Sequence, residues 1–128
     1  MERINYSTNT IWEKETAYSR AVKCGHQIFV SGTTAVDEQG TIYYPKQVEQ
    51  QAIFIFEKIS KSLEALGASL QNVVRTRAFI TDIEQFKGFS NAHHRFFKDI
   101  KPVCTLVEIS ALVHPDLVIE IEVDAMLY

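Results

Sequence analysis

Residues 118–126 alternate between apolar and acidic side chains, and this alternation limits the possible folds more than any other feature of the chain. Successive side chains of a β-strand point to opposite faces of its sheet, so Ile119 and Ile121 would lie on one face and Glu120 and Glu122 on the other. The sequence therefore predicts a strand with one buried face and one face that carries carboxylates. Carboxylates rarely lie unpaired in the core of a monomer, so an uncovered face of this kind favours self-association.

Apolar residues elsewhere recur with helical or strand spacing and predict the remaining elements. The longest pattern is an apolar stripe, with spacings of three and four residues between Val48 and Leu66, that is bounded by Pro45 and Gly67. The predicted elements, in chain order, are strands at 19–24 and 27–31 around a Gly25-His26 turn, a helix at 45–67, a strand at 72–81, a helix at 83–97, and strands at 104–111 and 118–126. This order predicts a mixed α+β sheet with two helices on one face, in which the helices connect strands and hairpins supply antiparallel pairs.

Side-chain types assign the faces of these elements. The long helix is predicted to turn a charged face to solvent, and that face consists of Glu57, Lys58, Lys61 and Glu64. The strand at 72–81 places Arg75 and Arg77 opposite its buried face, which consists of Val74, Thr76, Ala78 and Ile80. Asp82 and Gln85 have the spacing of an N-cap residue and its partner in a capping box. The phenylalanines of the second helix are expected in the core or an interface, and these are Phe86, Phe89, Phe96 and Phe97.

Composition narrows the class of protein. The 128 residues form a single predicted domain, 1–128, which is long enough to bury about two-thirds of its surface without disulfides. A formal net charge of -3 argues against a nucleic-acid partner, since phosphate binding requires clustered Lys and Arg. No secretory signal and no apolar run of membrane-spanning length are evident, so we expect a cytoplasmic protein without membrane association. Cys24 and Cys104 match no metal-binding spacing and are expected to be free thiols.

Several short segments together resemble one known family. They are 18–22 (YSRAV), 28–32 (IFVSG), 73–77 (VVRTR), 91–97 and 102–125. Along nearly its whole length the chain is similar to the Rid family (reactive intermediate deaminase), the YjgF-type family that is also labelled endoribonuclease L-PSP. The resemblance implies a chorismate-mutase-like α+β fold with about six strands. It also implies a homotrimer in which the sheets surround a central barrel, the helices lie outside and clefts lie between neighbouring subunits.

The best-known activity of that family is the hydrolysis of enamines and imines released by pyridoxal-phosphate enzymes, which yields a 2-oxo acid and ammonia. In this chemistry the enamine tautomerises to an imine, water adds to the carbon atom and ammonia leaves. The site therefore needs an anchor for a substrate carboxylate and hydrogen bonds that place one water molecule. The resemblance implies a small-molecule ligand, which we expect to be a carboxylate. It implies no metal ion or cofactor.

The resemblance also assigns roles to individual residues. Tyr18 would form the aromatic wall of the cleft, and Ser31 and Gly32 would form its floor. Asn91 would contribute a polar contact from the second helix. Glu120 would hold the attacking water or relay a proton.

One position departs from the family pattern. Deaminating members carry an arginine near the start of the fifth strand, which binds the substrate carboxylate, whereas this chain has Cys104 there, followed by Thr105. Both residues are still expected to line the substrate site. A bidentate Arg–carboxylate contact contributes about 2–4 kcal/mol, so its loss would abolish useful 2-aminoacrylate hydrolysis unless another cation replaces it. Arg20 lies two residues beyond Tyr18 on the same strand face, and we hypothesise that Arg20 is this substitute, with a catalytic role beside Glu120.

Each candidate also has a structural interpretation. Cys104 could be a nucleophile, but a small buried packing residue is the favoured interpretation. Glu120 could pair with Arg75 or Arg77 at a subunit interface. His93 lies on the apolar stripe of its helix and is predicted to be a hydrogen-bonded packing residue, whereas His94 is predicted to be exposed. Adjacent helical residues do not face one metal ion together, so no metal site is expected there.

Three functions remain open on this basis. The leading one is a small hydrolase that acts on a reactive imine, enamine or related amino compound, such as an aminomuconate-like acid. The second is a trimeric protein that binds small carboxylic or aromatic metabolites without turnover. A ribonuclease, which the alternative family label suggests, is disfavoured because no basic stripe interleaves with the aromatic residues.

Overall fold

Six strands form one mixed sheet in the order β1-β2-β3-β6-β4-β5. The computed structural model describes residues 2–128. Its strands are β1 (Arg3–Tyr6), β2 (Ala21–Cys24), β3 (Gln27–Thr33), β4 (Val73–Ile80), β5 (Val103–Glu108) and β6 (Ile119–Met126). Its α-helices are α1 (Ile11–Thr16), α2 (Val48–Ala65) and α3 (Phe86–Phe97), and two short 3-10 turns cover Leu70–Asn72 and Ile83–Gln85.

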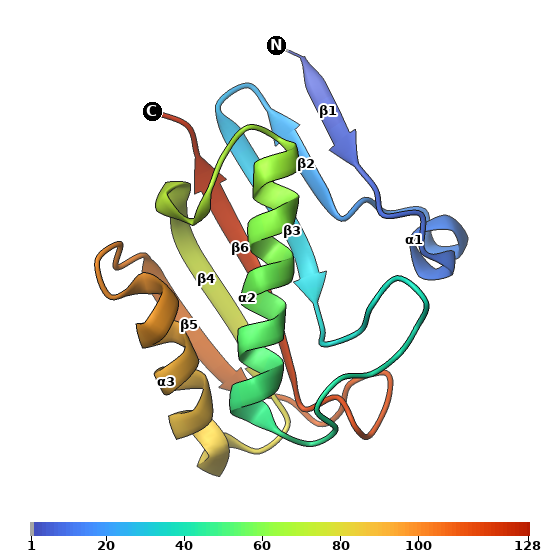
Figure 1. The fold of residues 1–128 in the computed structure, drawn as a ribbon, viewed down its shortest axis with the longest axis vertical. Coiled ribbons are helices and arrows are strands. Elements are labelled where there is room, and N and C mark those ends of the chain that lie inside the picture. Colours follow the sequence, from blue (N-terminus) through green and yellow to red (C-terminus); the bar gives the residue numbers. More distant parts are fainter. Residues whose placement is uncertain (1) are drawn as a thin grey trace.

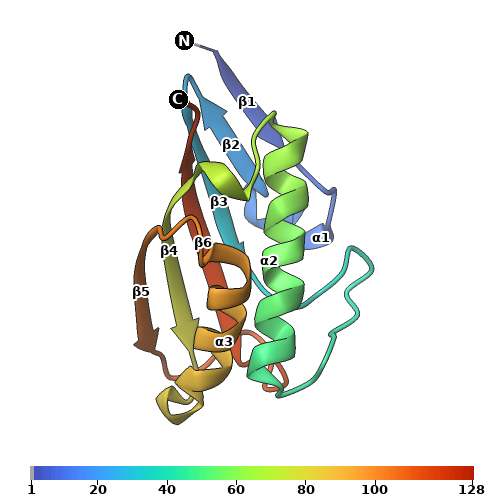
Figure 2. The same cartoon turned by 60° about the vertical axis from the view of Figure 1, so that its left-hand side comes forward.

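Both long helices lie on the same face of the sheet, as the sequence predicts (Figure 1 and Figure 2). β2 and β3 form the predicted antiparallel hairpin, and α3 connects the parallel pair β4 and β5. β6 enters the sheet between β3 and β4 and runs antiparallel to both. The last strand is therefore central rather than peripheral, and its two edges pair with the two halves of the sheet.

The first two elements of the chain, β1 and α1, are absent from the sequence prediction. β1 is only four residues long and mostly exposed, so it carries no clear alternation. α1 spans six residues, fewer than two helical turns, and ends at Ala17 in a left-handed conformation with φ of 66°. Neither pattern is long enough to stand out from a loop.

A buried carboxylate fixes α1 against the segment that precedes it. Glu13 accepts hydrogen bonds from the hydroxyls of Ser7 (2.6 Å), Thr8 (2.6 Å) and Thr10 (2.9 Å). Burial by itself raises the pKa of Glu13, but these hydrogen bonds outweigh it and lower the pKa from the ordinary 4.5 to about 2. The ionised Glu13 therefore holds the turn that leads into Tyr18.

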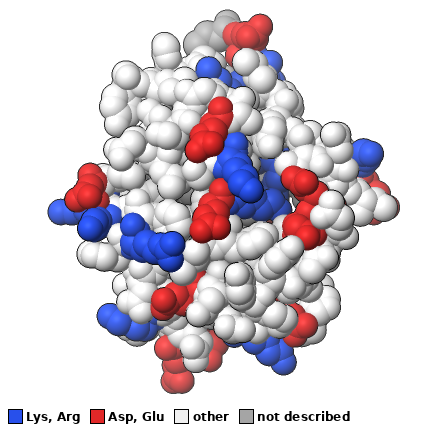
Figure 3. Space-filling model, in the orientation of Figure 1, with Lys and Arg blue, Asp and Glu red and all other residues white. Residues whose placement is uncertain are grey.

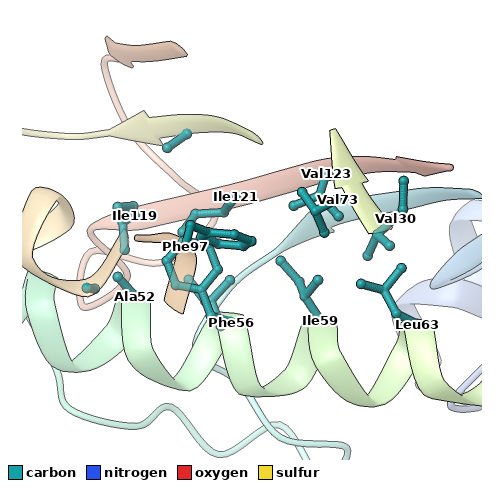
Figure 4. Close-up of a cluster of buried hydrophobic side chains, with 14 of the residues drawn as sticks. Val30, Ala52, Phe56, Ile59, Leu63, Val73, Phe97, Ile119, Ile121 and Val123 are labelled. Atoms are coloured by element: carbon teal, nitrogen blue, oxygen red, sulfur yellow. The ribbon is translucent and has the colours of Figure 1, made fainter. Parts of the chain in front are cut away.

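The hydrophobic core lies between α2 and the central strands (Figure 4). Ala52, Phe56, Ile59 and Leu63 follow the helical spacing of three and four residues and are fully buried. They face a layer of strand residues, namely Val30, Val73, Ile119, Ile121 and Val123. Burial of a side chain such as Phe56 contributes about 1.5–3 kcal/mol, so this single layer accounts for much of the stability.

The prediction for strand β4 is wrong at one position. Thr76, Ala78 and Ile80 are buried as expected, but Val74 is 40% exposed while Val73 is buried. The register between β4 and β6 shifts between Val73 and Arg75, which is a β-bulge. An extra residue in one strand reverses the faces beyond it, and the sequence alternation alone does not reveal this.

The start of the second helix also differs from the prediction. The Asp82 side chain accepts a hydrogen bond from the Glu84 backbone N–H at 3.0 Å, but within residues 2–128 Gln85 makes no reciprocal capping contact. A 3-10 turn precedes α3 instead of a first α-helical turn. Phe86 consequently lies 54% exposed, whereas Phe89 and Phe97 further along the helix are buried.

Charges of both signs are interspersed on the helix-bearing side of the molecule (Figure 3). Among the helices of residues 2–128, none combines the length and apolarity that a membrane span requires. The opposite face of the sheet carries neither α2 nor α3 (Figure 2). Apolar side chains remain open on this bare face, including Phe29 (46% exposed), Val103 (57%) and Val107 (42%).

Candidate functional site

A cavity of about 460 Å³ opens where β3 ends and β6 begins. Residues from α1, β3, α2, β6, the segment before β2 and two loops converge on it. Its lining includes Thr10, Trp12, Thr16, Tyr18, Arg20, Gly32, Thr34, Val36, Gly40, Ile42, Lys58, Val113, His114, Leu117 and Glu120. Four of the eight residues that the sequence analysis assigned to the site meet here, namely Tyr18, Arg20, Gly32 and Glu120.

Arg20 is a buried cation at this cavity. Only 6% of the residue is exposed, and its Nη2 donates a hydrogen bond to the Gly32 carbonyl oxygen at 2.8 Å. The guanidinium carbon lies 5.6 Å from the centre of the Tyr18 ring, which provides a cation–π contact. Its Nε–H is buried and has no hydrogen-bond partner among residues 2–128. Arg20 therefore retains a donor for a further acceptor.

A β-bulge in β3 creates the acceptor for Arg20. The register with β6 shifts between Val30 and Thr33, so one extra residue is accommodated at Ser31 and Gly32. The bulge interrupts the ladder to β6, and the carbonyl of Gly32 accepts from Arg20 instead. The local irregularity of β3 thus orients the guanidinium.

Ser31 lies on a different surface from the cavity. Its hydroxyl donates to the Ser19 carbonyl oxygen at 2.7 Å, and the residue lines a separate shallow hollow together with Tyr18. Tyr18 therefore stands between that hollow and the cavity. In the isolated chain the Ser31 hydroxyl ties β3 to the segment before β2.

Glu120 is half-buried and lines the cavity beside Gly32. Burial raises the pKa of the Glu120 carboxyl, the nearby Arg20 charge opposes this, and Glu122 adds to the rise. A second hollow, on the bare face of the sheet next to Phe79 and Val113, is also lined by Glu120. The carboxyl group therefore lies at the junction of two solvent-accessible spaces.

Within the single chain, residues 2–128, Glu120 forms no ion pair with Arg75 or Arg77, so the pairing expected across a subunit interface stays a prediction. Arg77 binds Glu122 instead, with 2.6 Å between Nε and Oε1. Both arginines also contact Asp124, at 3.6 Å for Arg75 and 3.4 Å for Arg77. Because these three pairs occupy the arginines further along β6, the Glu120 carboxylate remains free to face the cavity.

Comparison with known proteins identifies the family. Residues 8–127 match the family model described as Endoribonuclease L-PSP. The chain belongs to the endoribonuclease L-PSP family. It is similar to a RutC family protein of Saccharolobus solfataricus, with 36% identity over 108 residues that cover 84% of this chain and 85% of that protein.

Solved structures of the same family share the fold. A member of the YjgF/YER057c/UK114 family from Mycobacterium tuberculosis matches with a TM-score of 0.90 and 34% identity, over 98% of this chain and 100% of that one. A protein of the conserved Rid family from Yersinia pestis matches with a TM-score of 0.87 and 25% identity, over 98% of this chain and 100% of that one. The Rid resemblance and the α+β fold expected from the sequence are confirmed.

Besides Ser31, three residues expected in the site of an L-PSP family member lie outside this cavity in the single chain. Asn91 donates from Nδ2 to the Glu49 carboxylate at 3.0 Å and joins α3 to α2. Cys104 and Thr105 lie on the edge strand β5, three strands from β3 in the sheet. Cys104 is exposed, so the interpretation of Cys104 as a buried packing residue is wrong for this chain. Its thiol is free, as predicted.

Cys104 and Thr105 also point to opposite faces of the sheet. Cys104 pairs in register with Thr76, whose hydroxyl is hydrogen-bonded to His93 at 2.9 Å beneath α3. Thr105 pairs with Arg77, which lies on the bare face. His93 packs against phenylalanine rings of the core and is the packing residue that its periodicity predicts.

The sequence analysis missed Lys58, which it assigned to the solvated face of α2. Lys58 lines the cavity, and its ammonium donates to the Val36 carbonyl oxygen at 2.8 Å. Burial and then the neighbouring Arg20 charge lower its pKa from 10.5 to about 8, against the opposing effect of nearby carboxylates. The available signal was its spacing: Lys58 lies seven residues after Gln51 and four before Ser62, which are both buried on the same helix flank.

Proposed function

We propose that the cavity binds a small anionic imine or enamine and hydrolyses it to an oxo acid and ammonia. Membership of the L-PSP family supports a small deaminase-like or metabolite-binding protein. The observation that carries the proposal is the pairing of a buried guanidinium, Arg20, with a half-buried carboxyl group, Glu120, on one cavity wall. An anion anchor and a proton-transfer group are the two elements that imine hydrolysis needs.

Arg20 is the anchor in this proposal. A buried cation favours a bound anion, because burial removes the water that would otherwise solvate the charge. Arg20 has an unused Nε–H among the described residues, and a substrate carboxylate would accept from it. This role would compensate for Cys104, which the family resemblance aligns with the carboxylate-binding arginine of deaminating members.

Glu120 is the proton-transfer group. Water attacks the carbon of the protonated imine, the C=N π electrons move to nitrogen, and the Glu120 carboxylate takes one proton from that water as the new C–O bond forms. The protonated Glu120 then gives its proton to the amine nitrogen of the resulting carbinolamine. The C–N bond breaks, ammonia leaves, and the hydroxyl proton returns to Glu120 as the C=O bond forms. A carboxyl group whose pKa is raised by burial suits both steps, because its acid and base forms are closer in energy near neutral pH.

The protein is proposed to act as a homotrimer. The bare face of the sheet exposes Phe29, Val103 and Val107 next to the charged pairs of β4 and β6. Apolar surface of this kind on a sheet without a helix layer is typical of an interface between subunits. Glu120 and Val113 extend from the cavity to that face, so a neighbouring subunit would close the open side of the site.

A binding protein without turnover is the second candidate. The specific observation in its favour is Cys104, because a substitution at the family's anchor position is compatible with retained binding and lost catalysis. Saturable binding of carboxylates with no ammonia release, from any imine tested, would establish this alternative.

Ammonia release from imines that an amino-acid oxidase generates in the assay tests the proposal. We expect Arg20→Gln to lower kcat/KM roughly 30- to 1,000-fold, mainly through KM, since one charged hydrogen-bonded contact is lost. Glu120→Gln should lower kcat with little change in KM. Arg95→Gln, on the exposed part of α3, is the matched control and should retain full activity. Unchanged ligand affinity in Arg20→Gln would remove Arg20 from the site.

A further inference from the structure

Lys58 is a second cation on the wall of the same cavity, and it is half-buried. It projects from the middle of α2, and one of its three N–H donors binds the Val36 carbonyl oxygen at 2.8 Å. Arg20 lies close enough for its charge to lower the pKa of Lys58. Two cations therefore share one cavity of about 460 Å³.

No carboxylate of residues 2–128 forms an ion pair with either cation. Three nearby carboxylates affect the pKa of Lys58 from beyond contact distance, and these are Glu13, Glu38 and Asp37. Hydroxyls of the 7–10 segment occupy the Glu13 carboxylate, as described above. Asp37 accepts from the backbone N–H groups of Gln39 and Thr41 and from the Tyr43 hydroxyl.

The cavity lining contains more cationic side chains than acidic ones. Glu120 is the one acidic side chain in the lining. A buried cation without an anionic partner is costly, and a bound anion offsets that cost. The volume of the cavity is in the range that accommodates a small metabolite.

We infer that Lys58 is a second anion-binding residue, so that the ligand of this cavity is a small molecule with two anionic groups, one bound by Arg20 and the other by Lys58. This inference rests on the proposed role of the cavity as the ligand site and defines the substrate class more closely. The substrate is then an imine or enamine of a dicarboxylic acid. A monocarboxylate leaves one of the two cations without an anion and binds more weakly.

A purely structural role for Lys58 makes a different prediction. Its hydrogen bond to Val36 fixes the loop between β3 and α2, and loss of that bond alone would weaken all ligands equally. If both cations bind one ligand, Lys58 instead strengthens the binding of a dicarboxylate more than that of a monocarboxylate. The preference of the protein for the dicarboxylate then depends on residue 58. The ratio of two affinities therefore separates the two roles.

Intrinsic fluorescence measures that ratio directly. Trp12 is the one tryptophan of the sequence and lines the cavity, so ligand binding should change its emission. The probes are succinate and butyrate, which have the same number of carbon atoms and differ by one carboxylate. We expect the wild-type protein at pH 7 to bind succinate at least about tenfold more tightly than butyrate. One additional charged hydrogen bond contributes a difference of this size.

Variants at two positions of α2 complete the test. Lys58→Gln and Lys58→Met should reduce the succinate preference to near unity, and Lys58→Arg should retain it. Lys61→Gln, one turn away on the exposed face of the helix, should match the wild type. Two neutral variants of different polarity are used because one of them could fail to fold, which a thermal melt detects.

The outcomes separate this inference from the proposed function. A wild-type protein that shows no succinate preference, or neutral variants that keep it, would overturn the role of Lys58 whether or not imines are hydrolysed. A preference that depends on Lys58 without ammonia release from any dicarboxylic imine would support the inference and overturn the hydrolase proposal.

Discussion

The Cα of Gly32 faces the side chain of Glu120 so closely that a Cβ on residue 32 would lie 3.0 Å from the Glu120 Cδ and would overlap its Oε2. Gly32 is therefore required by the space that the Glu120 carboxylate occupies, not by the backbone conformation. The same residue supplies the carbonyl that binds Arg20. One glycine thus positions both groups to which we assign the chemistry.

Gly32→Ala should lower activity more than stability. The new methyl group would meet the flexible end of Glu120, so the carboxylate should move while the strand remains in place. We expect kcat to fall at least tenfold, and thermal unfolding to reveal a cost of about 1 kcal/mol or less. Gly67→Ala is a useful comparison because nothing within 4 Å would contact its Cβ, although its positive φ of 81° adds strain. A Gly32→Ala protein with full activity would show that the position of the Glu120 carboxylate is unimportant.

Glu13→Ala should destabilise the protein by about 2–4 kcal/mol at neutral pH, because three hydroxyl groups lose their charged acceptor. The pKa of Glu13 is lower in the folded protein than in the unfolded chain, so its contribution is complete above the ordinary pKa of 4.5 and is lost as the pH falls towards about 2. The difference between wild type and variant should therefore shrink over that window. Urea denaturation at pH 7 and pH 3 measures it.

Glu15→Ala is the control for that measurement, since Glu15 lies exposed on the same helix. Its stability should follow that of the wild type at both pH values. Equal effects of the two substitutions at pH 7 would contradict the role of Glu13 in fixing α1.

Succinate affinity should fall as the pH rises through about 8, the pKa of Lys58 in the free protein. Only the protonated amine attracts an anion, so each further pH unit should cost about tenfold until the higher pKa of the complex is reached. The other charged groups near Lys58 are Arg20, Glu13, Asp37 and Glu38, and Glu120 lines the same cavity. His114 also lines the cavity.

Lys58→Arg should remove this pH dependence between pH 7 and 9.5, because arginine remains protonated there. Fluorescence titrations at half-unit intervals measure the profile for both proteins. A decline of equal steepness in Lys58→Arg would assign the titration to another group.

The proposed assembly should depend on the bare face of the sheet. Analytical ultracentrifugation should give the wild-type protein a mass about three times its 14.6 kDa. Val107→Asp places a charge on an exposed apolar position of β5 next to Phe79 of β4, so we expect it to shift the protein towards smaller species. The substitution Ile11→Asp, at an exposed apolar residue of α1, should leave the mass unchanged. A monomeric wild-type protein would exclude the trimer.

Strong periodic patterns predicted most of the fold. The stripe of α2 and the alternation of β6 are long and regular, so both elements and their buried faces follow directly from the sequence. β1 and α1 are too short to give such a pattern. The exposure of Val74 depends on a bulge, which arises from pairing between distant strands and leaves no local trace in the sequence.

The candidate site was only partly predictable for the same reason. Tyr18 and Arg20 both line the cavity, although they precede β2 and do not share a strand face as the sequence analysis assumed. Lys58 enters the site because the 34–42 loop covers its side of α2, which a helical pattern cannot show. The pairing of Arg77 with Glu122 rather than Glu120 likewise depends on the register between β4 and β6.

The central position of β6 has a consequence for how the protein folds during synthesis. β6 connects β3 to β4, so the sheet consists of two separate parts until residues 119–126 have left the ribosome. Until then β3 and β4 each present an unpaired edge, the kind of surface that attracts strands from other chains. A nascent chain of this protein is therefore most prone to aggregation just before its final strand emerges.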